Sequence, residues 1–513
     1  MTGTTTIEID NSAFKGSIHV PTGLFIDGKW VDPVEPDMID PSCLSVSSTQ
    51  ARYLSMIYPI PLTLLRTIAT GKKIAAVALG SSKDVDIAVK AAQKAYKTTW
   101  GLKCPGSKRG RLLTRLADLL ERDIDQFAAL ESINAGKPFA VAKGQDMAGT
   151  IQCIRYFGGW ADKVHGKTIE SNENKLAYTR HEPYGVVGQI IPWNFPMLML
   201  SWKVGPALAT GNCIVLKPSE MTPLSALKFA ELTVEAGFPP RCRQHRQWLR
   251  EHMQISKVAF TGSTLVGRKV LEASAKSNLK VVTLELGGKS PTVIFDDCNL
   301  EQTIKWATQA MYGNMGKRFS LGGRLLTNPS QDSHVSLDRV WAKLLATPSR
   351  RPHDTAPQVS KVQFDRIMGY IASGKESGAT VHIGGDRHGT EGYFIQPTIF
   401  TDCTPDMKIV KEEIFGPVAA VLKFKTEEEV IEAANATDYG LSACVFSENV
   451  GRALRVAHAF ESGQAYVNSA QLVEASIPFG GYKSSGIGRE HGEYALETYT
   501  QVKAVHVNIG LVI

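Results

Sequence analysis

Short runs of apolar residues alternate along the chain with segments that have helical periodicity. Apolar residues recur at helical spacing after Ser82 and in a second segment around Leu116, and Leu224 to Ala236 and Leu265 to Ala275 also have a helical pattern. The short continuous runs are Val186 to Ile191, Cys213 to Leu216, Val258 to Phe260 and Val281 to Leu284. Buried strands that alternate with helices indicate parallel β-α-β units, so the predicted fold class is α/β. Ligands are then expected at the carboxyl ends of the strands.

The C-terminal segment has a different period. Val505, Val507 and Ile509 alternate with His506 and Asn508, which predicts an antiparallel strand over Ala504 to Ile509 with one buried face. An exposed strand of this kind invites pairing with a second subunit. We therefore expect a homodimer or homotetramer.

Composition and charge narrow the choice of function. The chain has 513 residues, 43% hydrophobic and 21% charged, which is typical of a globular protein with two to four domains. Its net charge of +7 arises in three stretches, 41–68, 241–255 and 317–355, and the remainder carries a small negative charge. A basic excess confined to short stretches is not a polyanion-binding face, so no nucleic-acid partner is expected.

Cysteine usage and hydropathy bear on the compartment. The eight cysteines form no Cys-x-x-Cys pair or Cys/His cluster, so we expect no metal site and a reduced, cytoplasmic compartment. The most apolar window, Tyr53 to Leu65, contains two prolines and is too short to cross a membrane. Met1 to Phe14 lacks basic residues and is unlike a leader peptide. No membrane partner is expected.

A polar loop follows each of the four predicted strands. These loops are Pro192 to Pro196, Lys217 to Glu220, Thr261 to Gly267 and Glu285 to Pro291. Because the carboxyl ends of parallel strands meet at one edge of a sheet, the four loops are expected to line one crevice.

These motifs resemble those of the NAD(P)-dependent aldehyde dehydrogenase superfamily, in particular its general cytosolic and mitochondrial class. Three more segments carry the resemblance: Gly159 to Gly166, Lys411 to Val418 and Pro478 to Glu490. The resemblance implies a Rossmann-like parallel-sheet cofactor domain, an α/β catalytic domain and a small β oligomerisation element. The implied boundaries are 20–160 and 184–286 for the NAD-binding domain, 287–489 for the catalytic domain, 161–183 and 490–513 for the oligomerisation element, and 41–68 for an anomalous insertion.

The resemblance implies NAD as the cofactor. The residues expected to hold it are Trp193, Lys217, Glu220, Gly262, Ser263, Gly267, Glu413 and Phe415. Gly262 and Ser263 open a helix, whose free N–H groups favour a pyrophosphate, and the Glu220 carboxylate disfavours the 2′-phosphate of NADP. Simpler interpretations remain open: Ser263 as a plain helix cap, Lys217 and Glu220 as an ion pair, and Phe415 as a core residue.

The chemistry that the resemblance implies is covalent. A cysteine thiolate adds to a small-molecule aldehyde, a hydride passes to the cofactor, and water releases the carboxylic acid. Asn194 is expected to stabilise the oxyanion and Glu285 to activate the water. Phe195, Met199 and Trp202 match an apolar tunnel for aliphatic or aromatic aldehydes. The alternatives are a turn-forming role for Asn194 and a buried ion-paired role for Glu285.

One position departs from the family pattern. The family's nucleophile loop reads Asn-x-Gly-Gln-x-Cys-x-x-Gly-x-Arg, and here Asn314 to Arg324 places Phe319 where the cysteine is expected. Ser320 is a poor substitute, because an unactivated alcohol is a weak nucleophile. We therefore expect no aldehyde dehydrogenase activity from this chain.

The three basic stretches also depart from the pattern. Residues 241–255 replace an expected strand and glycine loop near the cofactor, which predicts weakened NAD binding. Residues 41–68 and 317–355 likewise do not match the family pattern. We favour frame or splice errors in a deduced aldehyde dehydrogenase sequence; the alternative is an inactive nucleotide-binding or structural paralogue.

Overall fold

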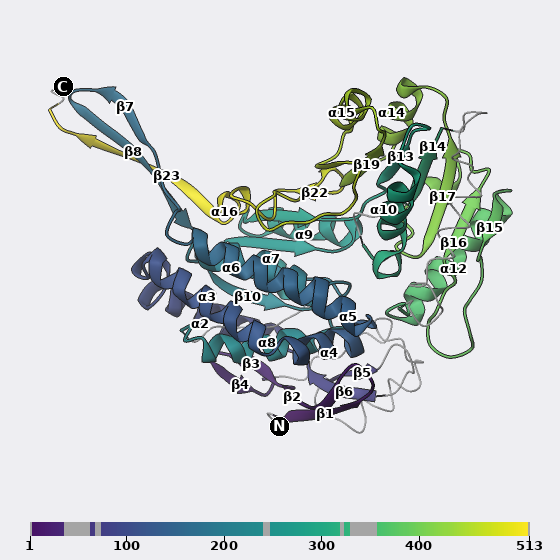
Figure 1. The fold of residues 1–513 in the computed structure, drawn as a ribbon. Helices are drawn as coiled ribbons and strands as arrows, with labels where there is room; N and C mark the ends of the chain where they lie inside the picture. The colour runs from purple at the N-terminus through teal and green to yellow at the C-terminus, as the bar shows by residue number, and fades with distance from the viewer. Residues whose placement is uncertain are drawn as a thin grey trace.

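The computed structural model describes residues 3–34, 62–66, 73–239, 247–318, 323–328 and 356–510. In these parts the chain forms a five-stranded sheet, a seven-stranded sheet, a three-stranded sheet and several two-stranded ones. Figure 1 shows a helix-rich body at the lower left, the seven-stranded sheet with its helices at the right, and an arm that projects from the body. The expected α/β architecture is confirmed.

The five-stranded sheet contains all four predicted strands. Its spatial order is β10 (Cys213–Lys217), β9 (Val186–Ile190), β11 (Lys257–Thr261), β12 (Val281–Glu285) and β22 (Gly486–Ile487). The first four strands run parallel, whereas β22 pairs with β12 in the antiparallel direction. The predicted bounds differ from these by single residues, because each buried run is bounded by polar or turn-forming residues.

Helix α2 (Ser82–Thr98) packs on this sheet against β9 and β10. It begins with a capping box: Ser81 Oγ accepts the N–H of Asp84, and the Asp84 carboxylate accepts the N–H of Ser81. The cap is thus Ser81, one residue before the predicted Ser82. The other helices of this body are η2 (Gly101–Lys103), α3 (Gly106–Arg122), α4 (Ile124–Ala135), α5 (Phe139–Val141), the π-helical η3 (Ala142–Met147), α6 (Ala148–Trp160), α7 (Pro196–Ala209), α8 (Leu224–Glu235) and α9 (Thr264–Lys276).

The seven-stranded sheet holds most of the remaining chain. Its order is β15 (Thr380–Ile383), β16 (Thr398–Thr401), β17 (Val418–Lys423), β14 (Arg324–Thr327), β13 (Pro291–Ile294), β19 (Ser442–Phe446) and β20 (Gln464–Val467). All neighbours are parallel except β15 and β16. Its helices are α10 (Leu300–Tyr312), α12 (Lys361–Glu376), α13 (Lys408–Lys411), α14 (Glu427–Asn435) and α15 (Val450–Ala459), and the turn η5 (Gly313–Gly316) follows α10.

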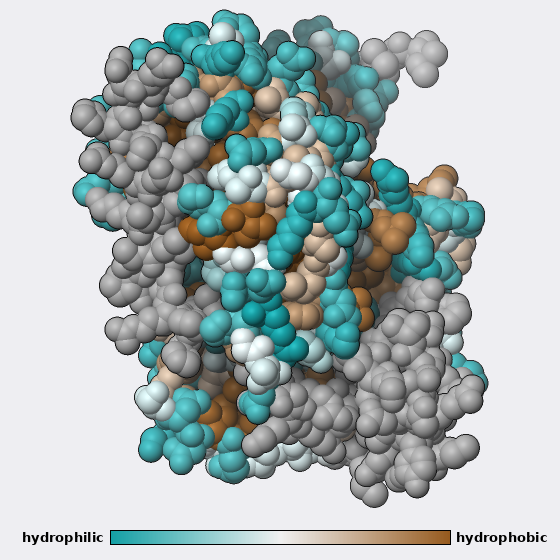
Figure 2. Space-filling view, turned by 90° about the vertical axis from the view of Figure 1, so that its right-hand side faces the viewer, coloured by the Kyte–Doolittle hydropathy of each residue, from teal (hydrophilic) through white to brown (hydrophobic). Residues whose placement is uncertain are grey.

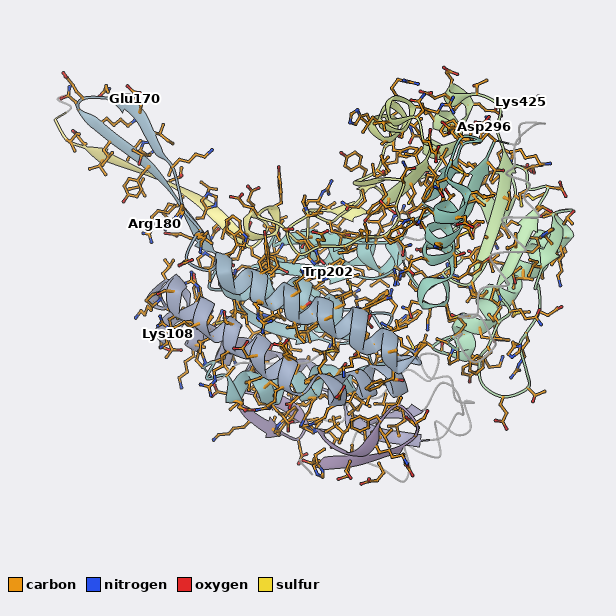
Figure 3. All side chains as sticks on the ribbon, viewed as in Figure 1. Lys108, Glu170, Arg180, Trp202, Asp296 and Lys425 are labelled. Carbon is orange, nitrogen blue, oxygen red and sulfur yellow. The ribbon has the colours of Figure 1, made fainter. Side chains whose placement is uncertain are left out.

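The arm consists of β7 (Thr168–Asn172), β8 (Lys175–Pro183) and β23 (Thr500–Asn508), in the order β23-β8-β7. The predicted C-terminal strand is therefore confirmed, and it pairs antiparallel with β8. The expected buried face is wrong in part: Val505 and Val507 are only half-buried, and Ile509 lies beyond the strand with 59% of its surface exposed. Figure 3 places Glu170 and Arg180 on this arm, whereas Trp202 lies inside the body.

Small elements complete the described chain. These are β1 (Thr4–Asp10) with β2 (Lys15–Pro21), β3 (Leu24–Ile26) with β4 (Lys29–Val31), β5 (Leu62–Arg66) with β6 (Lys73–Ala78), β18 (Tyr439–Gly440) with β21 (Tyr482–Lys483), the short helix α16 (Tyr494–Glu497) and η4 (Gln247–Arg250). Residues 247–255 of the arginine-rich stretch are 3₁₀-helix, turn and coil, so the expected lack of a strand is confirmed for that part.

The surface mixes polar and apolar residues. Figure 2 shows several small apolar patches between hydrophilic side chains on the face turned toward the viewer. In the part of the chain that the structure describes, no helix combines the length and apolar character needed to cross a membrane.

Candidate active site

The four strand-end loops meet at one edge of the five-stranded sheet, as predicted. Thr261 at the end of β11 pairs in register with Glu285 at the end of β12, and Lys217 pairs with Ile190 at the end of β9. The N–H of Gly262 donates to the carbonyl of Glu285 at 3.0 Å, which joins two of the loops directly. The parallel register therefore brings the predicted polar residues to a common edge.

Glu285 is almost completely buried, with 3% of its surface exposed. Burial raises its pKa well above the usual value, and the negative charge of Glu490 raises it further. Its Oε2 has no hydrogen-bond partner among the described residues. A carboxylate with a raised pKa and an open acceptor position can take a proton from water.

A buried ion pair lies beside Glu285. Lys203 Nζ donates to Glu490 and, at 2.6 Å, to the Thr261 hydroxyl, and the Lys203 side chain has no exposed surface. Neither residue of this pair was assigned a role from the sequence. The available signal was that Lys203 is the single charged residue in the apolar helix α7. Its amine partly offsets the carboxylate charges near Glu285.

The Asn194 side chain is buried and already hydrogen-bonded. Its Nδ2 donates to the carbonyl of Lys317 at 2.7 Å, and Asn314 Nδ2 donates to the carbonyl of Asn194 at 3.0 Å. Asn314, Met315 and Gly316 have positive φ angles of 51°, 56° and 70°. These strained conformations bring the Lys317 carbonyl to Asn194. One of the two N–H groups of the Asn194 amide thus donates to the backbone.

Residues expected at the cofactor lie around the N-terminus of α9. Ser263 Oγ accepts the N–H of Val266 at 3.4 Å as its cap, which leaves other first-turn N–H groups without an intrahelical acceptor. Gly267 packs closely on Leu286, because a Cβ at Gly267 would lie 2.6 Å from a Leu286 methyl carbon. Leu265 in the same turn is 67% exposed. Free N–H donors beside an exposed apolar side chain fit a dinucleotide.

Four of the five remaining cofactor candidates form two local pairs, and the fifth, Glu413, contacts the backbone. Lys217 Nζ contacts Glu220 Oε2 at 2.9 Å, as in the simpler ion-pair interpretation. Trp193 and Phe415 meet edge to face, with ring centroids 5.4 Å apart. Glu413 Oε1 accepts the N–H of Gly288 at 3.0 Å, and burial raises the pKa of Glu413. Glu413 therefore reaches the loop that follows Glu285.

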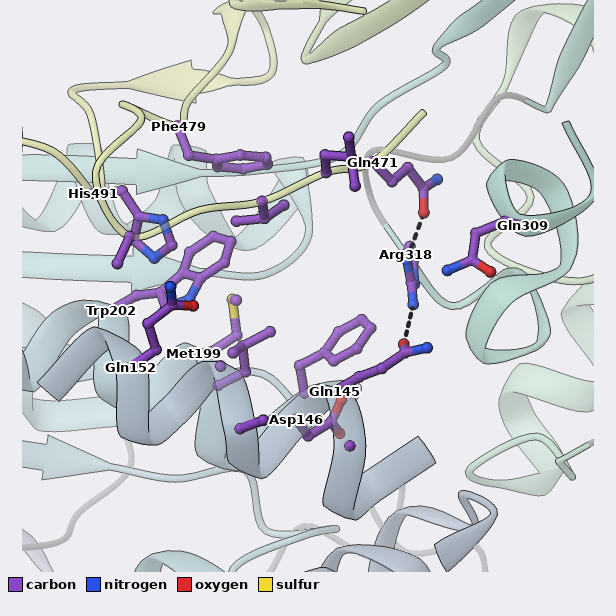
Figure 4. Close-up of a pocket in the computed structure, with 18 residues that line it drawn as sticks. Gln145, Asp146, Gln152, Met199, Trp202, Gln309, Arg318, Gln471, Phe479 and His491 are labelled. Atoms are coloured by element: carbon purple, nitrogen blue, oxygen red, sulfur yellow. Dashed lines mark hydrogen bonds between the residues drawn. The ribbon is translucent and has the colours of Figure 1, made fainter. Parts of the chain in front are cut away.

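The three predicted tunnel residues share one cavity of about 620 Å³. Phe195, Met199 and Trp202 line it together with Phe479, and Arg318 stands at one end (Figure 4). Sequence reasoning did not assign Arg318 to this cavity, because the residues that it contacts come from distant segments of the chain.

A sequence model of the aldehyde dehydrogenase family matches residues 65–505. An aldehyde dehydrogenase of Agaricus bisporus is 54% identical over 511 residues, which cover 98% of this chain and 97% of that protein. One from Emericella nidulans is 50% identical, with 96% of each chain covered. This chain belongs to the aldehyde dehydrogenase family. The NAD⁺ complex of an aldehyde dehydrogenase from Bacillus cereus has a TM-score of 0.87 and 41% identity, and covers 98% of this chain and 100% of that one.

Phe319, which the sequence analysis places at the expected nucleophile position, lies outside the described residues. Four cysteines in the described part have pKa values raised by burial: Cys153 to about 12, Cys403 to about 11, Cys444 to about 12, and Cys298. A thiol with a raised pKa supplies little thiolate. None of these four cysteines lines the cavity.

Proposed function

We propose that this chain carries the framework for NAD-dependent oxidation of aldehydes to carboxylic acids, and that Phe319 leaves it without the required nucleophile. The observation that carries the framework is the position of Asn194 and Glu285 at the ends of strands β9 and β12, with an aldehyde-sized cavity lined by Phe195. Family membership supports the reaction class.

When bound, NAD supplies the hydride acceptor. In this proposal Gly262 and Ser263 at the N-terminus of α9 would hold its pyrophosphate, and Lys217 and Glu220 would hold its adenosine ribose. The family resemblance assigns the nicotinamide ribose and ring to Glu413 and Phe415, and Trp193 to the cofactor site. The carboxylate of Glu220 favours NAD over NADP because it repels a 2′-phosphate.

The side chains divide the chemistry as follows. Glu285 removes a proton from water so that the water can release the acid product. Asn194 donates to the developing oxyanion with the amide N–H that is not bonded to the Lys317 carbonyl. An aldehyde carbon releases a hydride only after a nucleophile has added to it, and the phenyl ring of Phe319 cannot add.

Phe319 at the expected nucleophile position favours a second candidate, a non-catalytic member that binds nucleotide or serves as a structural subunit. In that case NAD binding would persist without turnover.

NADH absorbance with a simple aldehyde tests the proposal. We expect no NADH from this chain and little from Phe319→Cys alone. A chimera with residues 41–68, 241–255 and 317–355 taken from the Agaricus bisporus relative should produce NADH, and Glu285→Gln in that chimera should abolish it. NADH formation by the unaltered chain, sensitive to Glu285→Gln, would refute the assignment of the nucleophile position. An inactive chimera that still binds NAD would favour the second candidate.

We further propose that the arm joins subunits into a dimer or tetramer. The three-stranded sheet has free edges at β7 and β23, and several apolar side chains on it are exposed: Ile169 by 47%, Leu176 by 41% and Val502 by 63%. Strand pairing or packing across these surfaces would bury them. Light scattering should give a multiple of 55.9 kDa, and a monomer at micromolar concentration would contradict this proposal.

A further inference from the structure

Arg318 occupies one end of the cavity described above, between two amide side chains. Its terminal nitrogens donate to Gln471 Oε1 at 2.6 Å and to Gln145 Oε1 at 3.0 Å. Figure 4 shows Arg318 bridging these residues at one end, with Trp202 and Phe479 toward the other. The cavity therefore has a cationic end and an aromatic end.

Arg318 forms no direct ion pair in the described part of the chain, and the nearby charge of Asp146 acts on it without a hydrogen bond. Both of its hydrogen-bond acceptors are neutral amides, and its Nε has no acceptor among the described residues. The one acid that lines the cavity, Asp146, already forms a buried ion pair with Lys137. A guanidinium whose Nε is buried without an acceptor, and which forms no ion pair among the described residues, is costly, so the site favours an anion.

The shape of the cavity restricts which anion fits. Met199, Trp202 and Phe479 make its other end apolar, and its volume of about 620 Å³ suits a small organic molecule. A guanidinium has five N–H donors in a planar fork, and only two of the five are used by the glutamines. The fork matches the geometry of a carboxylate.

We propose that this cavity binds a small monocarboxylate with an apolar tail, with the carboxylate on Arg318 and the tail against Trp202 and Phe479. This rests on the proposed function in one respect: carboxylic acids are the product class of aldehyde oxidation. Arg318 would then hold the acid product more strongly than the aldehyde.

Calorimetric titration tests this with hexanoate and its uncharged analogue hexanamide. Because a hydrogen bond to a charged group is worth more than a neutral one, hexanoate should bind at least about tenfold more tightly than hexanamide. Arg318→Gln should remove that preference, whereas Arg318→Lys should retain part of it. Arg455→Gln removes an exposed arginine on α15 and serves as the matched control, with unchanged binding expected.

Each outcome is decisive for the binding proposal. Equal affinity for hexanoate and hexanamide, or a hexanoate preference that survives in a folded Arg318→Gln variant, would overturn it. Loss of binding in both Arg318 variants with native circular dichroism would also contradict it, because lysine preserves the charge. The titration requires no turnover, so an absence of NADH formation would count against the proposed reaction and not against this site.

Discussion

Breaking the buried ion pair between Lys203 and Glu490 should destabilise the protein far more than breaking an exposed pair. Removal of one partner of a buried pair typically costs about 3–5 kcal/mol, because the other charge stays buried without compensation. Glu490→Gln should lie near the lower end, since glutamine keeps an oxygen for the Lys203 amine and Thr261 still accepts from it. Lys203→Met should lie near the upper end, because it leaves Glu285 and Glu490 without this amine.

The double variant Lys203→Met/Glu490→Gln measures the coupling directly. Once both charges are removed, neither partner remains unpaired, so its cost should be well below the summed costs of the single variants. Arg455 and Glu427 form the matched exposed pair, in which the arginine side chain is 63% exposed. Glu427→Gln should cost less than about 1 kcal/mol.

Urea unfolding followed by tryptophan fluorescence, at one pH and protein concentration, supplies these free energies. Two results would refute the reasoning: a cost for Lys203→Met no larger than that of Glu427→Gln, or additivity of the single changes to within about 0.5 kcal/mol.

Three further predictions concern single residues. Because the pKa of Glu285 is raised in the folded state, the stability of the wild type relative to Glu285→Gln should fall as the pH rises from about 4.3 through the folded pKa. A constant difference in urea midpoint across this pH range would contradict that prediction. Burial lowers the pKa of Lys257 to about 7, so the stability of the wild type relative to Lys257→Met should rise between pH 7 and about 10.4. A stability difference between the two proteins that stays flat or falls over this range would contradict the prediction. Gly166→Ala should distort the base of the arm, because a Cβ there would lie 1.7 Å from the Thr179 carbonyl oxygen. The molar mass measured by light scattering should then shift toward that of the monomer. An unchanged molar mass would refute the link between the arm and subunit assembly.

The four parallel strands of the five-stranded sheet could be predicted nearly to the residue, whereas β22 was not predicted. Their apolar runs are local, and polar or turn-forming residues mark both ends, as at Lys217 and Glu285. The family resemblance, and not a local pattern, pointed to Phe195, Met199 and Trp202, which the structure brings to one cavity. Local periodicity was therefore sufficient for the strands but not for the cavity.

Pairings between distant segments were not accessible in this way. Lys203 and Glu490 are 287 residues apart, Asn194 and Lys317 are 123 apart, and Arg318 contacts a glutamine 153 residues further along the chain. Each of these contacts depends on how separate elements pack, and no local period encodes it.

The short strand β22 connects the sheet edge that carries Glu285 to the arm. Gly486 pairs with Glu285 itself, and the N–H of Leu286 donates to the Ser485 carbonyl at 2.8 Å. The chain then passes Glu490 and the short helix α16 before it becomes the arm strand β23. A force on the arm, such as the docking of another subunit, would therefore be transmitted along a short, hydrogen-bonded path to the carboxylate that sits beside Glu285. If the arm joins subunits as proposed, subunit assembly and the proton affinity of the proposed base would be linked through this path.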